Sequence, residues 1–494
     1  MSVRLKILGS STLLSSAEVV NNGCMFLRNM ILARILDKGD FGIAATLGLV
    51  VSLFELVGKM SFGQQVIQSP SGDEPEFQKA THVSQALAGI LSAFLILIFA
   101  YPLSRCFGME SHRGALMLLA IIPLCTGFTS LDLYRQVRHL RFAPLVLTDT
   151  VPQVLITLAA WPLAKWLGDY RAILCLILAK AAFSLVTSHL VSQRHYQLCW
   201  QPRLIQENLR FGSPLLVSGF LMFAIFQGDR MLIASVYPMT ALGVYAVAST
   251  LAMAPCFAIL RISGTASLPI MAHAQNDPEK FRAYYGNYAQ ALALLGTVFA
   301  VTMILGGETI ITLLFGLKYR DAAALAAWLT IGQAFRIMRG APTCAALAKG
   351  DTVNTMLANV SRLLGLGLAV PVVLLKMDLC WVAVAGGVGE FLALATSIIR
   401  LRWKHGLLLR DCLYPAGLMA ALALAAYVAK DALTPSQPAT SLALAAGGCA
   451  VSLAMFGVVF AGLRRASFSL LSDVMLKLKD VIKNGRVKSA DSRA

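Results

Sequence analysis

Residues 28–68 read RNMILARILDKGDFGIAATLGLVVSLFELVGKMSFGQQVIQ. This stretch joins the end of one long apolar segment to the whole of the next through the short turn LDKGD. Arg28, Glu55 and Lys59 lie inside these apolar segments, where an ionised side chain at the centre of a bilayer costs about 2.5–3.5 kcal/mol. We therefore expect these three side chains to face protein or water instead of lipid.

The composition is typical of a membrane protein. Of the 494 residues, 57% are hydrophobic and 14% are charged, and the mean hydropathy is +0.70. Soluble domains average about 25% charged residues. About 18–20 apolar residues are enough to cross a bilayer as a helix. We predict an all-α polytopic membrane protein with about fourteen transmembrane helices, at roughly 9–35, 41–67, 81–104, 113–133, 144–164, 170–191, 211–237, 240–270, 286–315, 321–348, 352–375, 379–400, 412–430 and 440–463.

An internal repeat relates the two halves of the chain. Two sets of four residues have nearly the same spacing: 19, 14 and 17 residues in Gly9, Arg28, Gly42 and Lys59, and 18, 13 and 18 residues in Gly212, Arg230, Gly243 and Arg261. The segment FGIAA at 41–45 also corresponds to LGVYA at 242–246. This pattern predicts two six-helix units in the same orientation, related by an axis along the membrane normal.

The predicted organisation has four parts: an N-terminal lobe with spans 1–6 at residues 1–208, a C-terminal lobe with spans 7–12 at 209–410, two appended spans at 411–463, and a tail at 464–494. Basic residues are most frequent in the connections on the side of the two termini, which places both termini in the cytoplasm by the positive-inside rule. In the tail, apolar residues from Leu471 to Ile482 recur at helical spacing with lysines on the other side. This pattern predicts a basic amphipathic helix on the anionic lipids of the inner leaflet, with docking of a partner protein as the alternative.

Polar residues on the first two predicted spans indicate an aqueous pathway. Arg28 continues one helical face with Glu18 and Asn22, which is typical of a wall in contact with water. Glu55 and Lys59 are four residues apart, so they either neutralise each other or contribute separately to the pathway.

Basic residues outnumber acidic residues inside the predicted spans. We predict substrate-binding cations at Arg28, Lys59, Arg230, Arg261, Arg336, Arg339 and Arg362, and ion-coupling candidates at Glu18, Glu55, Asp229 and Glu390. The excess of positive charge favours a polyanionic substrate over a cationic one. The arginines are spread over several spans, unlike those of a voltage sensor, which recur every third residue on one helix.

Other functional classes find little support in the sequence. The ten cysteines are scattered without a CxxC motif and the seven histidines without ligand spacing, so we predict neither a disulfide framework nor a metal site. No nucleotide-binding or nucleophile motif is present, which argues against an enzyme and against a cofactor. The net charge is +17, and most basic residues lie in the connections and the tail on the predicted cytoplasmic side, as is usual for a membrane protein. We therefore predict no nucleic-acid partner.

Two stretches resemble a known family. RNMILARILDKGDFGIAA with SFGQQVIQ, and RFGSPLLVSGFLMFAIFQGDRMLIASVYPMTALGVYAVA at 210–248, are similar to the polysaccharide transporter family. That family consists of oligosaccharide flippases of the multidrug/oligosaccharidyl-lipid/polysaccharide exporter (MOP) superfamily. The resemblance implies a bacterial inner-membrane protein that moves a polyprenyl-(pyro)phosphate-linked oligosaccharide to the outer leaflet for exopolysaccharide, capsule or O-antigen synthesis. It also implies polymerase and glycosyltransferase partners and headgroup-binding roles for Arg28, Lys59 and Arg261. The driving force would be protons, sodium ions or the membrane potential.

Two other members of the superfamily are alternatives. A peptidoglycan-precursor flippase would share the span count and the basic residues, whereas a multidrug antiporter would have an acidic, aromatic cavity. A membrane polymerase or glycosyltransferase would need a large outer loop or a nucleotide-sugar site, and the sequence has neither.

Overall fold

The computed structural model describes residues 3–59, 62–432 and 438–460, and their regular elements are helices. The long helices are α1 (Val3–Ile35), α2 (Lys38–Lys59), α4 (Pro75–Cys106), α8 (Ala143–Leu167), α9 (Arg171–Leu190), α10 (Pro202–Val236), α11 (Met239–His273), α12 (Pro278–Phe315), α13 (Ala322–Ala348), α14 (Thr352–Leu374), α15 (Leu379–His405), α16 (Arg410–Ala432) and α17 (Pro438–Val459). The short helices are α3 (Phe62–Gln68), α5 (Arg113–Leu118), α6 (Ile121–Gly127) and α7 (Asp132–Arg138), and the 3-10 turns are η1 (Pro70–Asp73), η2 (Glu110–His112) and η3 (Leu317–Tyr319). The predicted all-α class is confirmed.

The chain is a multi-pass membrane protein by the length and hydropathy of its helices. Within the described residues, 11 helices are long and apolar enough to cross a bilayer, or up to 12 if the bent pair Glu110–Gly127 and Asp132–Arg138 is one span. Helices occupy all of the predicted span ranges, but α1 and α13 fall outside this set. Their charged and polar residues, such as Arg28 in α1 and Arg336 in α13, lower the hydropathy of these two helices.

The chain forms two compact units. Unit 1 contains residues up to 254 together with 311–325 and 363–386, and unit 2 contains 255–310, 326–362 and the residues from 387 onward. The boundary between the units therefore falls inside each of the five helices α11 to α15. These units are defined by contacts, whereas the predicted lobes are defined by a sequence repeat. The units therefore do not test the lobes, which stay a prediction.

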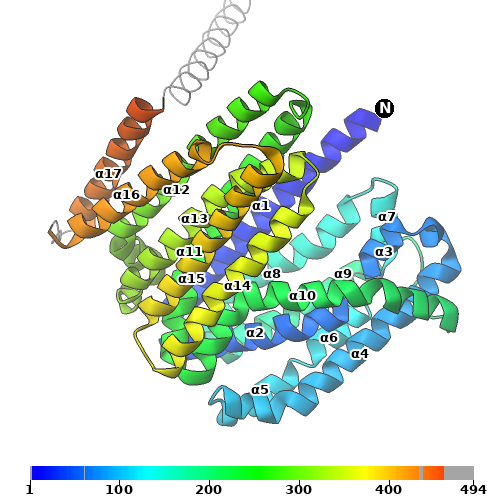
Figure 1. Cartoon of the computed structure of the whole chain (residues 1–494). Coiled ribbons are helices and arrows are strands. Elements are labelled where there is room, and N and C mark those ends of the chain that lie inside the picture. The colour runs from blue at the N-terminus through cyan, green and yellow to red at the C-terminus, as the bar shows by residue number, and fades with distance from the viewer. Residues whose placement is uncertain (1–2, 60–61, 433–437, 461–494) are drawn as a thin grey trace, which may run out of the picture. The chain divides into compact units, whose positions relative to one another are not determined.

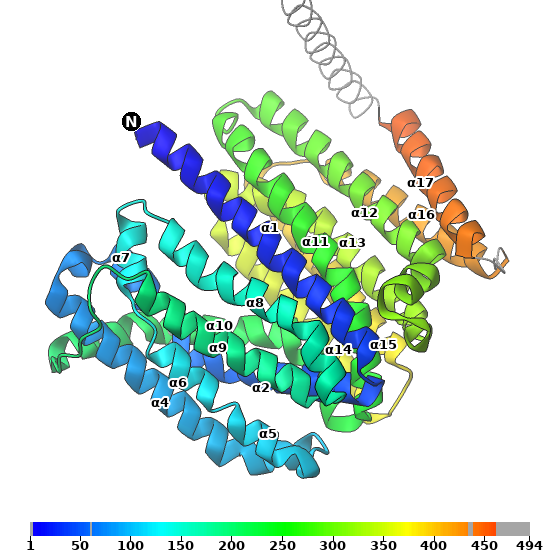
Figure 2. The same cartoon turned by 180° about the vertical axis from the view of Figure 1, so that it is seen from behind.

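Unit 1 is a bundle of tightly packed helices. Helix α2 packs against α4 and α10, and α6 packs against α4 and α9 (Figure 1). Helix α8 contacts both α1 and α9 (Figure 2). Gly89 of α4 and Gly127 of α6 meet closely, because a Cβ on Gly127 would lie 3.0 Å from the Cα of Gly89. Small residues of this kind let the backbones of two membrane helices approach each other.

The predicted span 113–133 is not one straight helix. It consists of α5, α6 and α7, and the axis turns by 46° between Gly127 and Asp132. The sequence Gly127-Phe128-Thr129-Ser130 lies at this bend. Glycine has a low helix propensity, and threonine and serine side chains compete with the backbone for hydrogen bonds, which weakens the helix here.

Unit 2 has a continuous apolar core. Phe281, Tyr285 and Phe456 are buried in it together with residues of α13 and α15. The two C-terminal helices belong to this unit and lie against α12: a Cβ on Gly306 of α12 would contact Ala445 of α17 at 3.2 Å. The side chain of Lys59 and the predicted amphipathic tail at 464–494 lie outside the described part of the chain.

Candidate functional site

A polar cavity of about 620 Å³ lies inside unit 1. Helices α1, α2, α3, α4, α6, α7, α8 and α9 all contribute to its wall. The polar residues of the wall are Arg28, Glu55, Gln64, Gln85, Thr126, Thr129, Ser130, Tyr134, Thr148, Asp149, Lys180 and Ser184. Ligand sites in proteins have volumes of about 300–1,000 Å³ and place a few polar groups in a mainly apolar wall. This cavity is the candidate functional site of unit 1.

Four of the residues that line the cavity carry charge. Arg28 and Glu55 were both predicted from the sequence, and the structure brings them to the same cavity. Asp149 of α8 and Lys180 of α9 were not predicted, although both are exposed on helices that are otherwise apolar. The criterion that identified Arg28, a charge inside an apolar segment, applies equally to Lys180.

The bend between α6 and α7 forms part of the cavity wall, and neighbouring side chains satisfy its backbone. The Gln85 amide of α4 donates to the carbonyls of Thr126 (2.8 Å) and Thr129 (3.1 Å). The backbone N–H of Leu131 donates to Nε2 of His82 at 3.0 Å. Buried backbone groups need partners, so these bonds let the span break without leaving polar groups unpaired at these positions.

His82 also contacts the segment that follows α9. Its Nδ1 lies 3.2 Å from the carbonyl oxygen of Gln197, and its ring stacks on that of Tyr196 with the centroids 4.3 Å apart. Because Nε2 accepts a hydrogen bond from the backbone, the proton of the neutral imidazole is on Nδ1. The buried imidazole thus joins α4 to the segment after α9.

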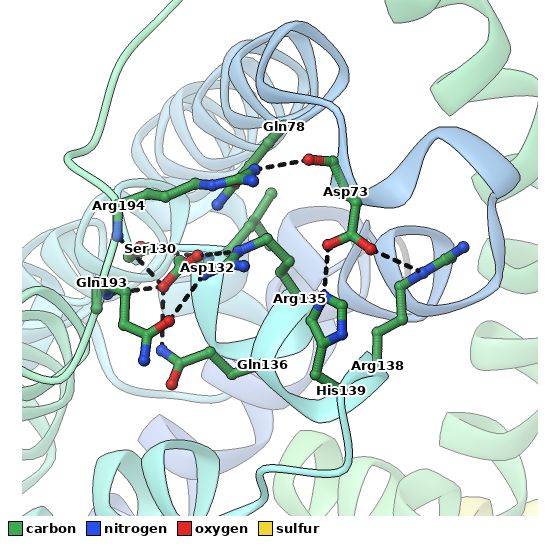
Figure 3. Close-up of polar contacts among 12 residues, drawn as sticks. Asp73, Gln78, Ser130, Asp132, Arg135, Gln136, Arg138, His139, Gln193 and Arg194 are labelled. Atoms are coloured by element: carbon green, nitrogen blue, oxygen red, sulfur yellow. Dashed lines mark hydrogen bonds and ion pairs between the residues drawn. The ribbon is translucent and has the colours of Figure 1, made fainter.

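The carboxylate of Asp132, at the start of α7, is the centre of a buried polar network (Figure 3). Its Oδ1 accepts a hydrogen bond from Nε of Arg135 at 2.5 Å. Its Oδ2 accepts from Nε2 of Gln136 at 3.0 Å and from the backbone N–H of Gln193 at 2.8 Å. The network fixes the segment after α9 to α7, on the far side of the bend from α6.

A second part of the network holds the turn before α4 (Figure 3). Nη1 of Arg194 donates to the carbonyl oxygen of Asp73 at 2.8 Å and to Oε1 of Gln78 at 3.1 Å. The Asp73 carboxylate lies 2.7 Å from Nε2 of His139 and 3.6 Å from Nε of Arg138. The hydrogen bond from His139 lowers the pKa of Asp73. These contacts connect the start of α4, the end of α7 and the segment after α9.

Three predicted cations of unit 2 converge on one predicted acid. Glu390 of α15 accepts from Nε of Arg336 at 2.8 Å and lies 2.5 Å from Nε of Arg362. Nη2 of Arg339 is 3.7 Å from its other oxygen. The side chains are between 3% and 12% exposed. The Arg336 guanidinium also lies 5.6 Å from the ring centre of Phe257. The cluster therefore combines three guanidinium groups with one carboxylate in a buried place.

The remaining predicted residues are distributed over both units. In unit 1, Asp229 accepts a hydrogen bond from the hydroxyl of Tyr245, and Nη1 of Arg230 donates to Oε1 of Gln227 at 3.3 Å. The neighbouring residues Asp229 and Arg230 thus have different side-chain partners. Glu18 is half-buried on α1. Arg261 is exposed on the part of α11 that belongs to unit 2.

An apolar groove of about 580 Å³ lies between α12, α16 and α17 in unit 2. Its wall consists mainly of Val301, Leu305, Leu422, Leu444 and Val451, with alanines and glycines between them. Such a surface suits a hydrocarbon chain and offers little to a polar headgroup. Among the described residues, no group of three or more His, Cys, Asp or Glu side chains is placed to hold a metal ion.

Sequence comparison identifies the family. Residues 31–324 match the family described as polysaccharide biosynthesis protein. A stretch of 143 residues is 29% identical to the EPS I polysaccharide export inner membrane protein EpsE of Ralstonia solanacearum, covering 28% of this chain and 33% of that relative. The match with this relative thus spans about a third of its length.

Structural comparison identifies the fold. The lipid II flippase MurJ in an inward closed conformation is similar with a TM-score of 0.71 at 12% identity, over 90% of this chain and 99% of that one. A multidrug resistance MATE family transporter of the MOP superfamily in an inward-facing conformation gives 0.60 at 14% identity, over 83% and 98%. At these identities the similarity is one of fold. The chain therefore belongs to the polysaccharide biosynthesis protein family, and its fold is that of the lipid II flippase MurJ and of the MATE transporter of the MOP superfamily.

Proposed function

We propose that this protein is a flippase that moves a polyprenyl-(pyro)phosphate-linked oligosaccharide from the inner to the outer leaflet of a bacterial inner membrane. The product would serve exopolysaccharide, capsule or O-antigen synthesis, and the polymerase and glycosyltransferases of that pathway would be its partners. The observation that carries the proposal is the polar cavity in unit 1, because Arg28 and Glu55 line it within a chain of the polysaccharide biosynthesis protein family. A hydroxylated, charged headgroup needs such a cavity to cross an apolar membrane.

The proposed topology has fourteen spans with both termini in the cytoplasm. Helices α1 and α13 have 33 and 27 residues, which exceeds the roughly 20 residues that a span requires. Their charged residues would be tolerated because those side chains face protein or a cavity instead of lipid. The lobes at 1–208 and 209–410 would alternate between inward-facing and outward-facing arrangements, with 411–463 as an appendix.

The seven basic residues predicted from the sequence would hold the anionic headgroup. The excess of guanidinium groups around Glu390 supports this role, because buried positive charge favours an anionic partner. Arginine suits phosphate because its planar fork donates two hydrogen bonds at once. The apolar groove beside α17 would accommodate the polyprenyl chain. The same excess of basic groups argues against the export of organic cations.

Transport would be coupled to protons or sodium ions through one or more of the acids Glu18, Glu55, Asp229 and Glu390. Glu55 is the most direct candidate of unit 1, because it lines the cavity. A carboxylate that gains or loses a proton inside such a cavity changes the charge that the substrate meets.

Arginine replacements test the proposal. Arg28→Ala and Arg261→Ala should abolish surface glycan per molecule of membrane protein, and the lysine variants should recover part of it, because the charge survives without the fork. Arg171→Ala is the control, since Arg171 pairs with Asp169 at an exposed position. Normal glycan export per molecule in both alanine variants would refute the proposal. If export is normal and peptidoglycan-precursor or drug transport falls instead, the alternative members of the superfamily apply.

A further inference from the structure

The wall of the unit 1 cavity contains acidic as well as basic residues. Besides Arg28, the wall contains the carboxylates of Glu55 and Asp149 and the ammonium group of Lys180. Carboxylates repel phosphate, so they are unsuited to a site whose only task is to bind a pyrophosphate. Their presence indicates a ligand of another kind in this cavity.

The balance of charge differs between the two charged sites. Among the described residues that line the cavity, Arg28 and Lys180 are opposed by Glu55 and Asp149, so the formal charges cancel. In the cluster of unit 2, three arginines share the carboxylate of Glu390. A multiply charged anion gains most from a site with several basic groups close together. The cavity therefore favours a ligand, or part of a ligand, without a large net charge.

The uncharged part of the cavity wall is rich in hydroxyl and amide groups. Gln64, Gln85, Thr129, Thr148 and Ser184 all line it. Hydroxyls both donate and accept hydrogen bonds, and amides provide both kinds of group, which matches the many hydroxyls of a sugar. Carboxylates such as Glu55 add strong hydrogen bonds by accepting from sugar hydroxyls.

The cavity also has an aromatic surface and free space beside its backbone. The ring of Tyr134 lies over Gly63, since a Cβ there would collide with three atoms of the ring. Both residues line the cavity, so glycine at 63 keeps the ring in the wall. At Gly48, which also lines it, an added Cβ would meet nothing within 4 Å. A larger side chain at 48 would thus project into open space.

We propose that the unit 1 cavity is a sugar-binding subsite, which takes the oligosaccharide portion of the lipid-linked substrate. This inference rests on the proposed function, because the sugar reaches the cavity as part of a lipid-linked substrate. Glu55, Asp149 and Lys180 bind sugar hydroxyls, and Arg28 lies where the sugar joins the phosphate. The subsite selects polyhydroxylated ligands of low net charge.

Binding by the purified full-length protein tests the subsite with three probes. The first is the polyprenyl-linked oligosaccharide extracted from the producing cells, the second is sugar-free farnesyl pyrophosphate, and the third is the oligosaccharide released by mild acid. Asp149→Asn, Lys180→Gln and Gly48→Leu should each weaken the first probe about tenfold or more, the loss expected for a hydrogen bond to a charged group or for a blocked site. Farnesyl pyrophosphate should bind them within about twofold of the wild type, which also shows that the variants are folded.

Controls and competition complete the test. Asp169→Asn and Gly114→Leu change a half-buried loop acid and an open glycine, neither of which lines the cavity, and both should bind all probes as the wild type does. The released oligosaccharide and farnesyl pyrophosphate should bind at the same time. Mutual exclusion of these two probes, or equal weakening of farnesyl pyrophosphate and the glycolipid in the cavity variants, would overturn the subsite. A wild type that binds neither glycolipid nor farnesyl pyrophosphate would instead overturn the proposed function.

Discussion

Gly42 and Gly243 lie against one another where α2 and α11 begin. A Cβ on Gly42 would overlap the carbonyl oxygen of Met239 and lie 3.1 Å from the backbone nitrogen of Gly243. A Cβ on Gly243 would overlap the carbonyl oxygen of Lys38 and lie 3.2 Å from the backbone nitrogen of Gly42. The contact is reciprocal, as contacts across a two-fold axis are. The two glycines are also matched positions of the sequence repeat, so the contact supports the proposed relation between the halves.

Alanine at either glycine should destabilise the protein. Gly42→Ala and Gly243→Ala force two backbones apart, and overpacking of this kind costs about 1–3 kcal/mol. Gly48→Ala and Gly264→Ala are matched controls on the same helices, because a Cβ at either position meets nothing within 4 Å. The controls should be neutral or slightly stabilising, since alanine is the better helix former. Melting temperatures in detergent measure the difference, and equal temperatures for all four variants would contradict the close contact.

Removing the carboxylate that three arginines of unit 2 share should lower the free energy of unfolding. Glu390→Gln leaves three buried guanidinium groups without their acid, and breaking a buried ion pair costs about 3–5 kcal/mol. Adding Arg339→Met should recover part of the loss, because it removes one uncompensated charge. Glu110→Gln is the control, since its pair with Arg105 is exposed and contributes at most about 1 kcal/mol. Thermal unfolding of the four proteins gives the comparison, and a stable Glu390→Gln protein would show that the cluster does not depend on this acid.

The ion cluster at the start of α14 should make stability depend on pH. Asp351 is buried and lies 2.8 Å from Nη2 of Arg400 and 3.1 Å from Nζ of Lys404. The hydrogen bonds from Arg400 lower the pKa of Asp351 below its usual value. A lowered pKa in the folded state stabilises the protein above the unfolded pKa of about 3.9, and this stabilisation is lost as the pH falls toward the folded pKa.

We therefore expect the stability difference between wild type and Asp351→Asn to be constant at neutral pH and to shrink below about pH 4. Asp321→Asn is the control, because Asp321 pairs with Lys38 at an exposed position. Melting temperatures between pH 3 and 8 check the expectation. A difference that grows on acidification would have the opposite sign and would exclude this assignment.

The backbone at the bend between α6 and α7 should become more mobile when its partners are removed. His82→Phe deprives the Leu131 N–H of its acceptor, and Gln85→Leu deprives two carbonyls of their donor. A buried polar group left unpaired costs about 1–3 kcal/mol, so amide exchange across 126–134 should accelerate about 5-fold to 150-fold. His273→Phe changes an exposed histidine in unit 2 and should leave this segment unaffected. Unchanged exchange in both variants would mean that other contacts hold the bend.

The sequence predicted the helices well because apolar length is a local property. It also singled out Arg28 and Glu55, which the structure places at one cavity, since charges are conspicuous inside apolar segments. The bend inside the predicted span 113–133 was not predicted, because the apolar residues on either side of Gly127 conceal a short break. Local hydropathy averages over such breaks, although the glycine followed by threonine and serine was a usable signal.

The contacts of the charged residues were less accessible from the sequence. Arg336, Arg339 and Arg362 were predicted as cations and Glu390 as an acid, but their convergence was not predicted. The contacts among these four residues depend on how α13, α14 and α15 pack. Helix packing cannot be predicted from the spacing of residues along one helix. Asp149 lies inside the predicted span 144–164 and therefore met the criterion that singled out Arg28, but its position in the same cavity wall as Glu55 depends on helix packing.

The bend has a consequence for the order in which the protein is made. The N–H of Ser130 donates to Oγ of Ser188 at 3.1 Å, and the carbonyl oxygen of Phe128 lies 2.9 Å from Nε2 of His189. Both partners are on α9, about sixty residues downstream, and leave the ribosome after the bend itself. The bent segment is thus synthesised before the two groups on α9 that complete its backbone hydrogen bonds, although its partners on α4 have already been made. In a chain that ends before α9, the N–H of Ser130 and the carbonyl of Phe128 lack these partners. We therefore expect the segment at the bend to stay out of the hydrocarbon region of the bilayer in such a chain.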